Sequence, residues 1–163
     1  MPIYSIVNHP LKVAKTQDSE WLNLIFSGEL DESTNLVQLV GDLQMKVCLK
    51  TRAITRINSV GLKIWMSFFQ RAKESGVELR YVDCSPVIAN HLHSMRLSGG
   101  GGTVLSVIGP FECQVCHHEF EVSISTPNIV AIKPQITSQK CPICKGPAVF
   151  DEIPQEFFQF LMI

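Results

Sequence analysis

Cys113-Gln-Val-Cys116 and Cys141-Pro-Ile-Cys144 are the two stretches that decide how the last third of this 163-residue chain folds. In each stretch two residues separate the cysteines, and a tight turn of that length brings both sulfurs toward one ion. Together the two pairs supply four thiolates, which are the ligands of a tetrahedral structural Zn²⁺ site. Because four sulfurs leave no open coordination position, the pattern predicts one structural zinc ion per chain and no metal catalysis.

Other readings of these cysteines stay open at the level of sequence. A single C-x-x-C pair is also found in redox proteins, and a site of four sulfurs also suits iron. His117 and His118 follow the first pair directly and are alternative ligands. Two disulfides are a further alternative, but the N-terminus lacks the pattern of a secretory signal, so we expect a reducing, cytoplasmic location. No apolar run reaches the ~18–20 residues that span a bilayer, and we expect no membrane contact.

Four consecutive glycines at 99–102 precede the cysteine pairs. Because glycine loses much backbone entropy on folding, such a run is typical of a flexible linker. We therefore expect a first domain at 1–98, a glycine linker at 99–102 and a second module at 103–163. Residues 103–108 are expected to form a strand, which is either the last strand of the first domain or the first strand of the second module.

The first domain shows alternating strand and helix patterns. Apolar runs and period-2 alternation predict strands, and apolar residues at helical spacing predict helices. Asp31 or Ser33 is expected to cap the first helix, and Ser85-Pro86 to start the last. The expected strands are 21–26, 45–49 and 77–82, with helices at 34–43, 62–73 and 86–97. This alternation predicts an α/β domain with helices packed on a sheet. For the second module we expect a small β-rich zinc ribbon, with a β-hairpin between the two cysteine pairs.

Charge is divided unevenly along the chain. Residues 1–102 hold 11 Lys and Arg against 9 Asp and Glu, whereas residues 103–163 hold 3 against 6. Nucleic-acid binding rests on Lys and Arg that neutralise phosphates. The net charge of −3 in the metal-bearing segment therefore argues against a nucleic-acid partner.

Three segments of the first domain, taken in order, resemble the STAS domain of bacterial anti-sigma factor antagonists and sulfate-transporter tails. They are Phe26-Ser-Gly-Glu-Leu-Asp31, Ile57-Asn-Ser-Val-Gly-Leu62 and Gly76-Val-Glu-Leu-Arg-Tyr-Val-Asp-Cys-Ser-Pro-Val87. The first resembles the junction between a strand and the first helix of that family. The second is similar to its D-S-[ST]-G loop, and the third to the next strand and the Ser-Pro start of the third helix. The resemblance covers about residues 20–98 and implies a STAS-like sheet with helices.

What the resemblance implies is binding and switching. In the antagonists an anti-sigma factor kinase docks on this loop and phosphorylates the serine after the aspartate, which corresponds to Ser59. The sequence departs from the family at two positions, because Asn58 replaces the aspartate and Val60 replaces a small hydroxylic residue. Ser59 is therefore the phospho-acceptor candidate, with an ordinary helix N-cap as its alternative role. The expected partner-binding residues are Asn58, Ser59, Val60, Gly61 and Phe68.

Phe68 lies on a stripe beside the face of its helix that is expected to pack on the sheet. It is predicted either to complete the core or to contact a partner, which includes a second copy of the chain. We find no nucleophile–base pair, phosphate-binding loop or open metal site, and therefore expect no enzymatic activity. The sequence predicts a non-enzymatic regulatory protein that docks a signalling partner. The alternative is a nucleic-acid-associated regulator that uses the zinc ribbon.

Overall fold

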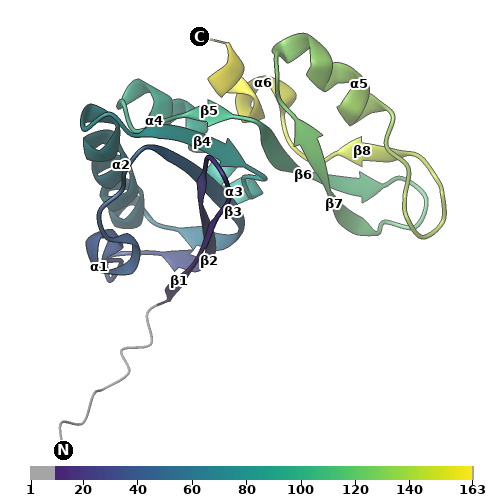
Figure 1. Ribbon diagram of the computed structural model, residues 1–163. Helices are drawn as coiled ribbons and strands as arrows, with labels where there is room; N and C mark the ends of the chain where they lie inside the picture. The colour runs from purple at the N-terminus through teal and green to yellow at the C-terminus, as the bar shows by residue number, and fades with distance from the viewer. Residues whose placement is uncertain (1–9, 163) are drawn as a thin grey trace, which may run out of the picture.

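The computed structural model describes residues 10–162 and contains a five-stranded mixed sheet with helices (Figure 1). The strand order is β1-β2-β3-β4-β5, with β1 antiparallel to β2 and all other neighbours parallel. The strands are β1 (Leu11–Gln17), β2 (Leu22–Leu30), β3 (Lys46–Ile57), β4 (Glu78–Val82) and β5 (Thr103–Val104). The α/β prediction is thus confirmed. The STAS resemblance also suggests a first strand at 4–14, and this range lies partly outside the described residues.

The helices of this first part follow the strands in turn. They are α1 (Leu36–Val40), α2 (Ser59–Glu74), α3 (Pro86–Ala89) and α4 (Leu92–Leu97). Parallel strands joined in sequence by right-handed crossovers place the connecting helices on one face of the sheet. Figure 1 accordingly shows α1, α2 and α4 on the same side of the strands. Trp65 and Phe69 of α2 are fully buried there, and the Trp65 ring meets Phe26 of β2 edge-on at 4.8 Å between centroids.

Two of the predicted helices differ from the observed ones. Asn35 caps α1 by accepting a hydrogen bond from the Gln38 amide, so the prediction that Asp31 or Ser33 forms the cap is wrong. Asp31 instead accepts from the Ser33 amide within the preceding turn. The helix expected at 86–97 is divided into α3 and α4. The His91 amide bonds to Ile88 only three residues back, which tightens the backbone at the break.

A second, three-stranded antiparallel sheet carries the cysteines. The strand order in this sheet is β7-β6-β8. Short helices follow β7 and β8 in the sequence. These elements are β6 (Ser106–Cys113), β7 (Glu119–Ser125), η1 (Ile129–Ala131), α5 (Ile132–Thr137), β8 (Ala148–Phe150), α6 (Pro154–Phe157) and η2 (Gln159–Leu161). The prediction of a β-hairpin between the two cysteine pairs is wrong. Only β7 lies there, and it pairs with the preceding strand β6 before the chain turns into η1 and α5.

Three of the four glycines at 99–102 are packed against neighbouring backbone, which corrects the expected linker character; Gly99 is exposed. Gly100 and Gly101 are buried. A Cβ atom added to Gly100 would lie 2.7 Å from the Met66 carbonyl oxygen, and one added to Gly102 would lie 2.4 Å from the Leu79 carbonyl oxygen. The run is therefore needed because the chain passes directly against the backbone of α2 and β4.

The two sheets share one hydrophobic core. Residues 103–104 extend the first sheet, and residues 106–113 begin the second, so the expected single strand at 103–108 is divided between them. The aromatic tail fills the junction, with Phe157, Phe158 and Phe160 all buried in the same cluster as the first-sheet core. The Arg96 guanidinium of α4 donates to the Phe160 carbonyl oxygen at 2.6 Å. Folding of the cysteine-bearing part and of the first sheet is therefore coupled.

Candidate metal centre and loop site

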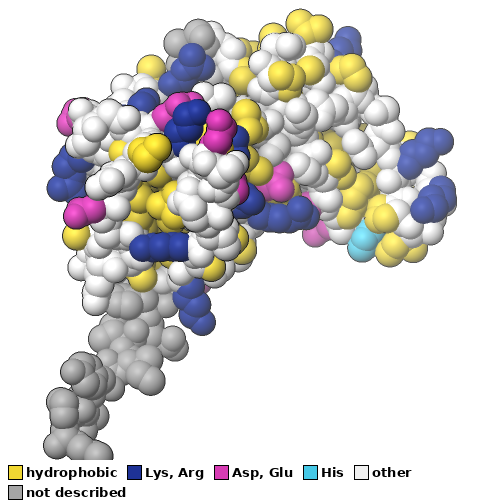
Figure 2. Space-filling view, viewed as in Figure 1, with side chains coloured by type: hydrophobic (Ala, Val, Ile, Leu, Met, Phe, Trp, Pro, Cys, Tyr) yellow, Lys and Arg dark blue, Asp and Glu magenta, His cyan; other side chains and the backbone are white. Residues whose placement is uncertain are grey.

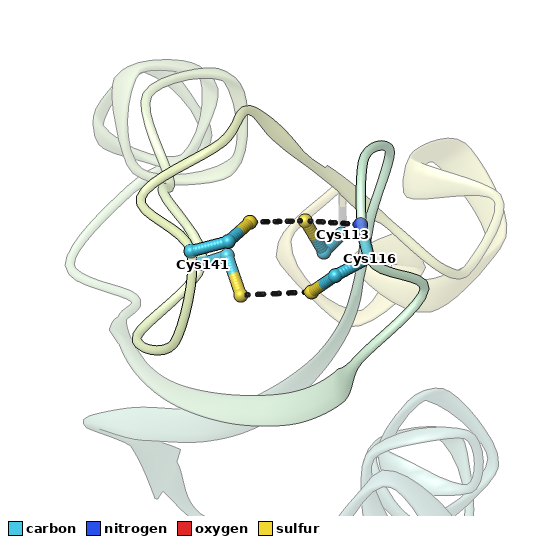
Figure 3. A group of neighbouring side chains, drawn as sticks. Cys113, Cys116 and Cys141 are labelled. Atoms are coloured by element: carbon cyan, nitrogen blue, oxygen red, sulfur yellow. Dashed lines mark hydrogen bonds between the residues drawn. The ribbon is translucent and has the colours of Figure 1, made fainter.

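The sulfurs of Cys113, Cys116 and Cys141 converge between two turns (Figure 3), and the Cys144 sulfur belongs to the same cluster. All four lie within 4.8 Å of one another, and no other group of three or more such ligands occurs in residues 10–162. The Cys113 and Cys144 sulfurs are 3.4 Å apart, and those of Cys116 and Cys141 are 3.6 Å apart. Tetrahedral coordination with Zn–S bonds of 2.3 Å requires sulfurs about 3.8 Å apart. The donor set therefore fits one tetrahedral metal ion.

The two turns that carry the sulfurs have the same backbone geometry. In each turn the amide four residues after the first cysteine bonds to the carbonyl oxygen of that cysteine, at 3.1 Å in both. The amides of Cys113 and Cys141 in turn donate to the carbonyl five residues ahead, at 3.0 and 2.9 Å. His117 and Lys145 occupy equivalent positions with φ of 58° and 62°. The tight C-x-x-C spacing thus produces two matching loops from different parts of the chain.

Backbone amides favour the thiolate form of the first cysteine in each pair. The Cys116 and Val115 amides donate to the Cys113 sulfur at 3.4 Å, and they lower the pKa of that thiol to about 6. For Cys141, burial opposes ionisation, but hydrogen bonds from the Cys144 and Ile143 amides outweigh it and lower the pKa.

The second cysteine of the first pair behaves in the opposite way. The His118 amide favours its thiolate, but burial and the three neighbouring sulfurs outweigh that bond and raise the pKa of Cys116 to about 12. Four thiolates this close together repel one another. A cation at their centre removes this repulsion, and its binding releases the remaining protons. The close approach of the four sulfurs therefore favours a bound cation.

The alternative ligands point elsewhere. His117 is exposed and its Nδ1 lies 2.9 Å from the Glu112 carboxylate. His118 stacks on Phe120 with 6.1 Å between ring centroids. Neither histidine belongs to the sulfur cluster. All six cysteines are free thiols, and the sulfur distances given above exceed the ~2.05 Å of a disulfide.

The remaining two cysteines lie in the first part of the chain. Cys48 on β3 and Cys84 after β4 are both fully buried. Burial raises the pKa of the Cys84 thiol to about 12, so this group stays protonated. Both side chains behave as the small apolar core residues that buried free cysteines usually are.

A second candidate site lies where α2 begins. Asn58, not Ser59, caps the helix, because its side-chain oxygen accepts from the Gly61 amide at 2.8 Å. Its side-chain amide donates to the Glu32 carboxylate at 2.7 Å. An aspartate at 58 could not make this second bond and would place two carboxylates together. The presence of asparagine is thus explained by Glu32, which sequence reasoning missed because 26 residues separate the two.

The residues predicted to bind a partner occupy different environments. Ser59 is exposed at the first position of α2, and Val60 is 46 % exposed. Gly61 is buried, and a Cβ atom there would lie 2.3 Å from the Leu30 carbonyl oxygen. Phe68 is half-buried and meets Phe69 edge-on at 5.0 Å. Residues 58–60 therefore form one exposed loop, whereas Gly61 and Phe68 serve mainly in packing.

This loop belongs to a larger edge of the molecule. Asp31 follows β2, Asn58 follows β3 and Asp83 follows β4, and these strands are parallel. The carboxyl ends of parallel strands meet at one sheet edge, where ligands of open α/β sheets commonly bind. A hollow of about 240 Å³ lies at this edge beside Glu29, Asp31, Arg56 and Asn58. Each of the three segments that resemble the STAS family contains one of these three residues.

Comparison of the sequence with protein-family models and with curated proteins finds no match. Within the described residues, every helix is too short or too polar to cross a lipid bilayer.

Proposed function

We propose that the chain is a non-enzymatic regulatory protein in which a STAS-like domain docks a signalling partner of the anti-sigma factor or kinase type. The observation that carries the proposal is the exposed loop 58–60 at the carboxyl edge of the sheet. Asn58 supplies the helix cap, and no hydrogen bond of the Ser59 hydroxyl is recorded among the described residues. That hydroxyl is consequently available to a partner or a kinase.

Phosphorylation of Ser59 would act strongly at this position. A phosphoryl group brings about −1.5 to −2 charges, which the N-terminal end of a 16-residue helix stabilises. Glu32 on the neighbouring turn lies against Asn58 and would repel it. The phosphorylated loop would therefore lose its present arrangement around Asn58, and a partner that contacts Asn58 and Val60 would meet a changed surface.

The metal centre has a structural role in this proposal. We propose zinc as the ion, since it prefers tetrahedral thiolate ligands and four sulfurs complete its coordination. The four cysteines then hold together the ends of β6 and β8, and the zinc-ribbon-like segment provides a second contact surface for the partner.

Affinity capture from the native cells with matched variants tests the docking site. Ser59→Glu with Val60→Glu alters the loop without removing the Asn58 cap. Ser67→Glu with Gln70→Glu places the same charge further along α2 and serves as the control. We expect a partner that binds the wild type and the control and is lost with the loop variant. A set of bound proteins that is identical for all three would refute docking at residues 58–60.

The phosphorylation step has a separate test. Intact-mass measurement of the protein from native cells should show a phosphoryl adduct that Ser59→Ala abolishes. An adduct that persists in Ser59→Ala would place the modification elsewhere. If no adduct appears under any growth condition, loop docking stands without the kinase step.

A further inference from the structure

The helices α1, α2 and α4 lie on one face of the five-stranded sheet, and the short α3 packs against β3 and β6. Alternate residues of a strand share a face, and part of the opposite face of β1–β3 is open to solvent. Its residues are exposed except for the half-buried Lys50. The strand register places Ala14 beside Ile25 and Ile25 beside Lys50. Ile25 is 39 % exposed although it lies in a central strand. We call this surface the open face, formed by Lys12, Ala14, Ile25, Lys50, Arg52 and Ala53.

The open face is positively charged and small apolar residues lie between its charges. Lys12, Lys50 and Arg52 have no ion-pair partner among residues 10–162, where the recorded pairs are Arg56–Glu29 and His117–Glu112. Like charges gathered on one surface raise its potential and attract an acidic counterpart. A surface that combines these charges with Ile25 and two alanines is suited to an acidic protein surface.

The same chain carries such an acidic surface on its second sheet. Glu119 and Glu121 are exposed on β7, and the register places Glu119 directly opposite Glu112. Like charges in opposite positions destabilise a sheet, and only Glu112 has a recorded partner there, His117. We call Glu112, Glu119 and Glu121 the acidic strip. It lies across the end of β6 and the outer strand β7, whose free edge pairs with no other described strand.

The open face and the acidic strip adjoin at Asp83. The Asp83 carboxylate accepts hydrogen bonds from Ser123 of β7 at 2.6 Å and from Ser106 at 2.8 Å. Glu121 lies two residues from Ser123 and so shares its face of β7. Asp83 directly follows Val82, which pairs with Lys50 of the open face. Figure 2 shows basic and acidic side chains next to one another where the two parts of the molecule meet.

We propose that two copies of the chain form a twofold dimer in which the open face of each binds the acidic strip of the other. A twofold axis makes both contacts at once, since each copy carries both surfaces. The residues of the open face lie on three strands, β1, β2 and β3. Three strands about 4.8 Å apart and five residues of about 3.3 Å each give a face of about 240 Å². Two contacts then bury about 950 Å² in total, which is in the range of weak, transient interfaces. The dimer is accordingly weak and salt-sensitive.

A single-stranded nucleic acid fits the open face less well. Such ligands are bound by aromatic side chains on which the bases stack, in addition to positive charge. Trp21 is the aromatic residue closest to this role, but the Arg80 guanidinium covers its ring at 3.9 Å. The open face itself offers Ile25 and alanines, and no ring.

Sedimentation of the full-length, metal-loaded chain at several protein concentrations tests the dimer. Raising the salt from about 0.1 M to about 1 M shortens the Debye length from about 10 Å to about 3 Å and should weaken association at least tenfold. A chain that stays monomeric at low salt, or a dimer that is equally stable at high salt, overturns the proposal.

Charge-reversal variants identify the two surfaces. Lys50→Glu with Arg52→Glu, and Glu119→Lys with Glu121→Lys, should each abolish self-association, and an equimolar mixture of the two variants should restore a 1:1 dimer. Lys63→Glu with Lys73→Glu makes the same charge change on the helical side and should leave the dimer intact. Thermal unfolding of each variant separates loss of association from loss of folding.

Failure of the mixture to associate, with both variants folded, overturns the reciprocal contact. A single-stranded oligonucleotide that binds the wild type but not the Lys50→Glu, Arg52→Glu variant, while self-association is unchanged, also overturns the dimer and assigns the open face to nucleic acid.

Discussion

Removal of the metal ion should destabilise the whole chain, including the sheet that carries no metal ligand. An ion held by the four sulfurs would join Cys116 to Cys141 and so close the loop of residues 117–140. A cross-link around a loop of this length removes about 3 kcal/mol of unfolded-state entropy, on the same reasoning that applies to disulfides. In a chain of 163 residues, 1 kcal/mol corresponds to a shift of about 2–4 °C in Tm. We therefore expect a fall of about 6–12 °C.

Tryptophan fluorescence is the assay that makes this prediction specific. Trp21 and Trp65 both lie in the first part of the chain, far in sequence from the four clustered cysteines. Phe157, Phe158 and Phe160 connect the two sheets in one core, so loss of the metal should shift the tryptophan transition together with the circular dichroism transition. Reduced protein with one bound metal ion is melted before and after treatment with a strong chelator.

A Cys116→Ser, Cys144→Ser variant is the matched control, because both cysteines are exposed and serine costs little there. It should contain no metal, melt at the temperature of the chelated wild type and show no response to the chelator. If chelation removes the ion and leaves the tryptophan transition unchanged, the two parts unfold independently and the reasoning from a shared core is wrong.

Three further predictions concern the backbone contacts and acid stability. Gly102→Ala should lower stability by about 1–3 kcal/mol, because its Cβ would lie 2.4 Å from the Leu79 carbonyl oxygen. Gly61→Ala should destabilise by a similar amount through its 2.3 Å approach to the Leu30 carbonyl oxygen, and should also displace the loop at Ser59. The pKa of Asp18 is lowered from 3.8 to about 2, chiefly by a hydrogen bond from the Glu20 amide. Its contribution to stability is therefore present above about pH 4 and lost as the pH falls toward 2, and Asp18→Ala should reduce this acid-dependent loss.

Denaturant unfolding measures each effect, and for each variant one result would contradict the prediction. A flexible linker at 99–102 would make Gly102→Ala stabilising, since alanine reduces the entropy of the unfolded chain. Gly41 has φ of 76° and no atom within 4 Å of an added Cβ, so Gly41→Ala should cost only about 1–2 kcal/mol of backbone strain. A Gly61→Ala variant more stable than Gly41→Ala would contradict the close contact. For Asp18, equal acid sensitivity of wild type and variant would exclude a folded-state role.

Much of the fold could be predicted from the alternation of apolar residues. The strands around Leu24 and Leu79 and the helix around Trp65 were predicted within a few residues, because local periodicity reports burial directly. The break at Asn90–His91 was not predictable, since the apolar residues continue at helical spacing across it. The hairpin prediction failed because strand pairing depends on neighbours distant in sequence, here β6 with β7.

The amino-acid sequence by itself determined the cluster of four sulfurs. Two C-x-x-C pairs specify two tight turns and four sulfurs whatever lies between them, because the geometry of each turn is local. The sequence also suggested Ser59, but the tertiary structure decided that Asn58 is the cap, through a bond to Glu32. It likewise decided that the glycines at 100–102 are packed and that one core spans both sheets. Such contacts join residues far apart in the chain, so local sequence patterns do not predict them.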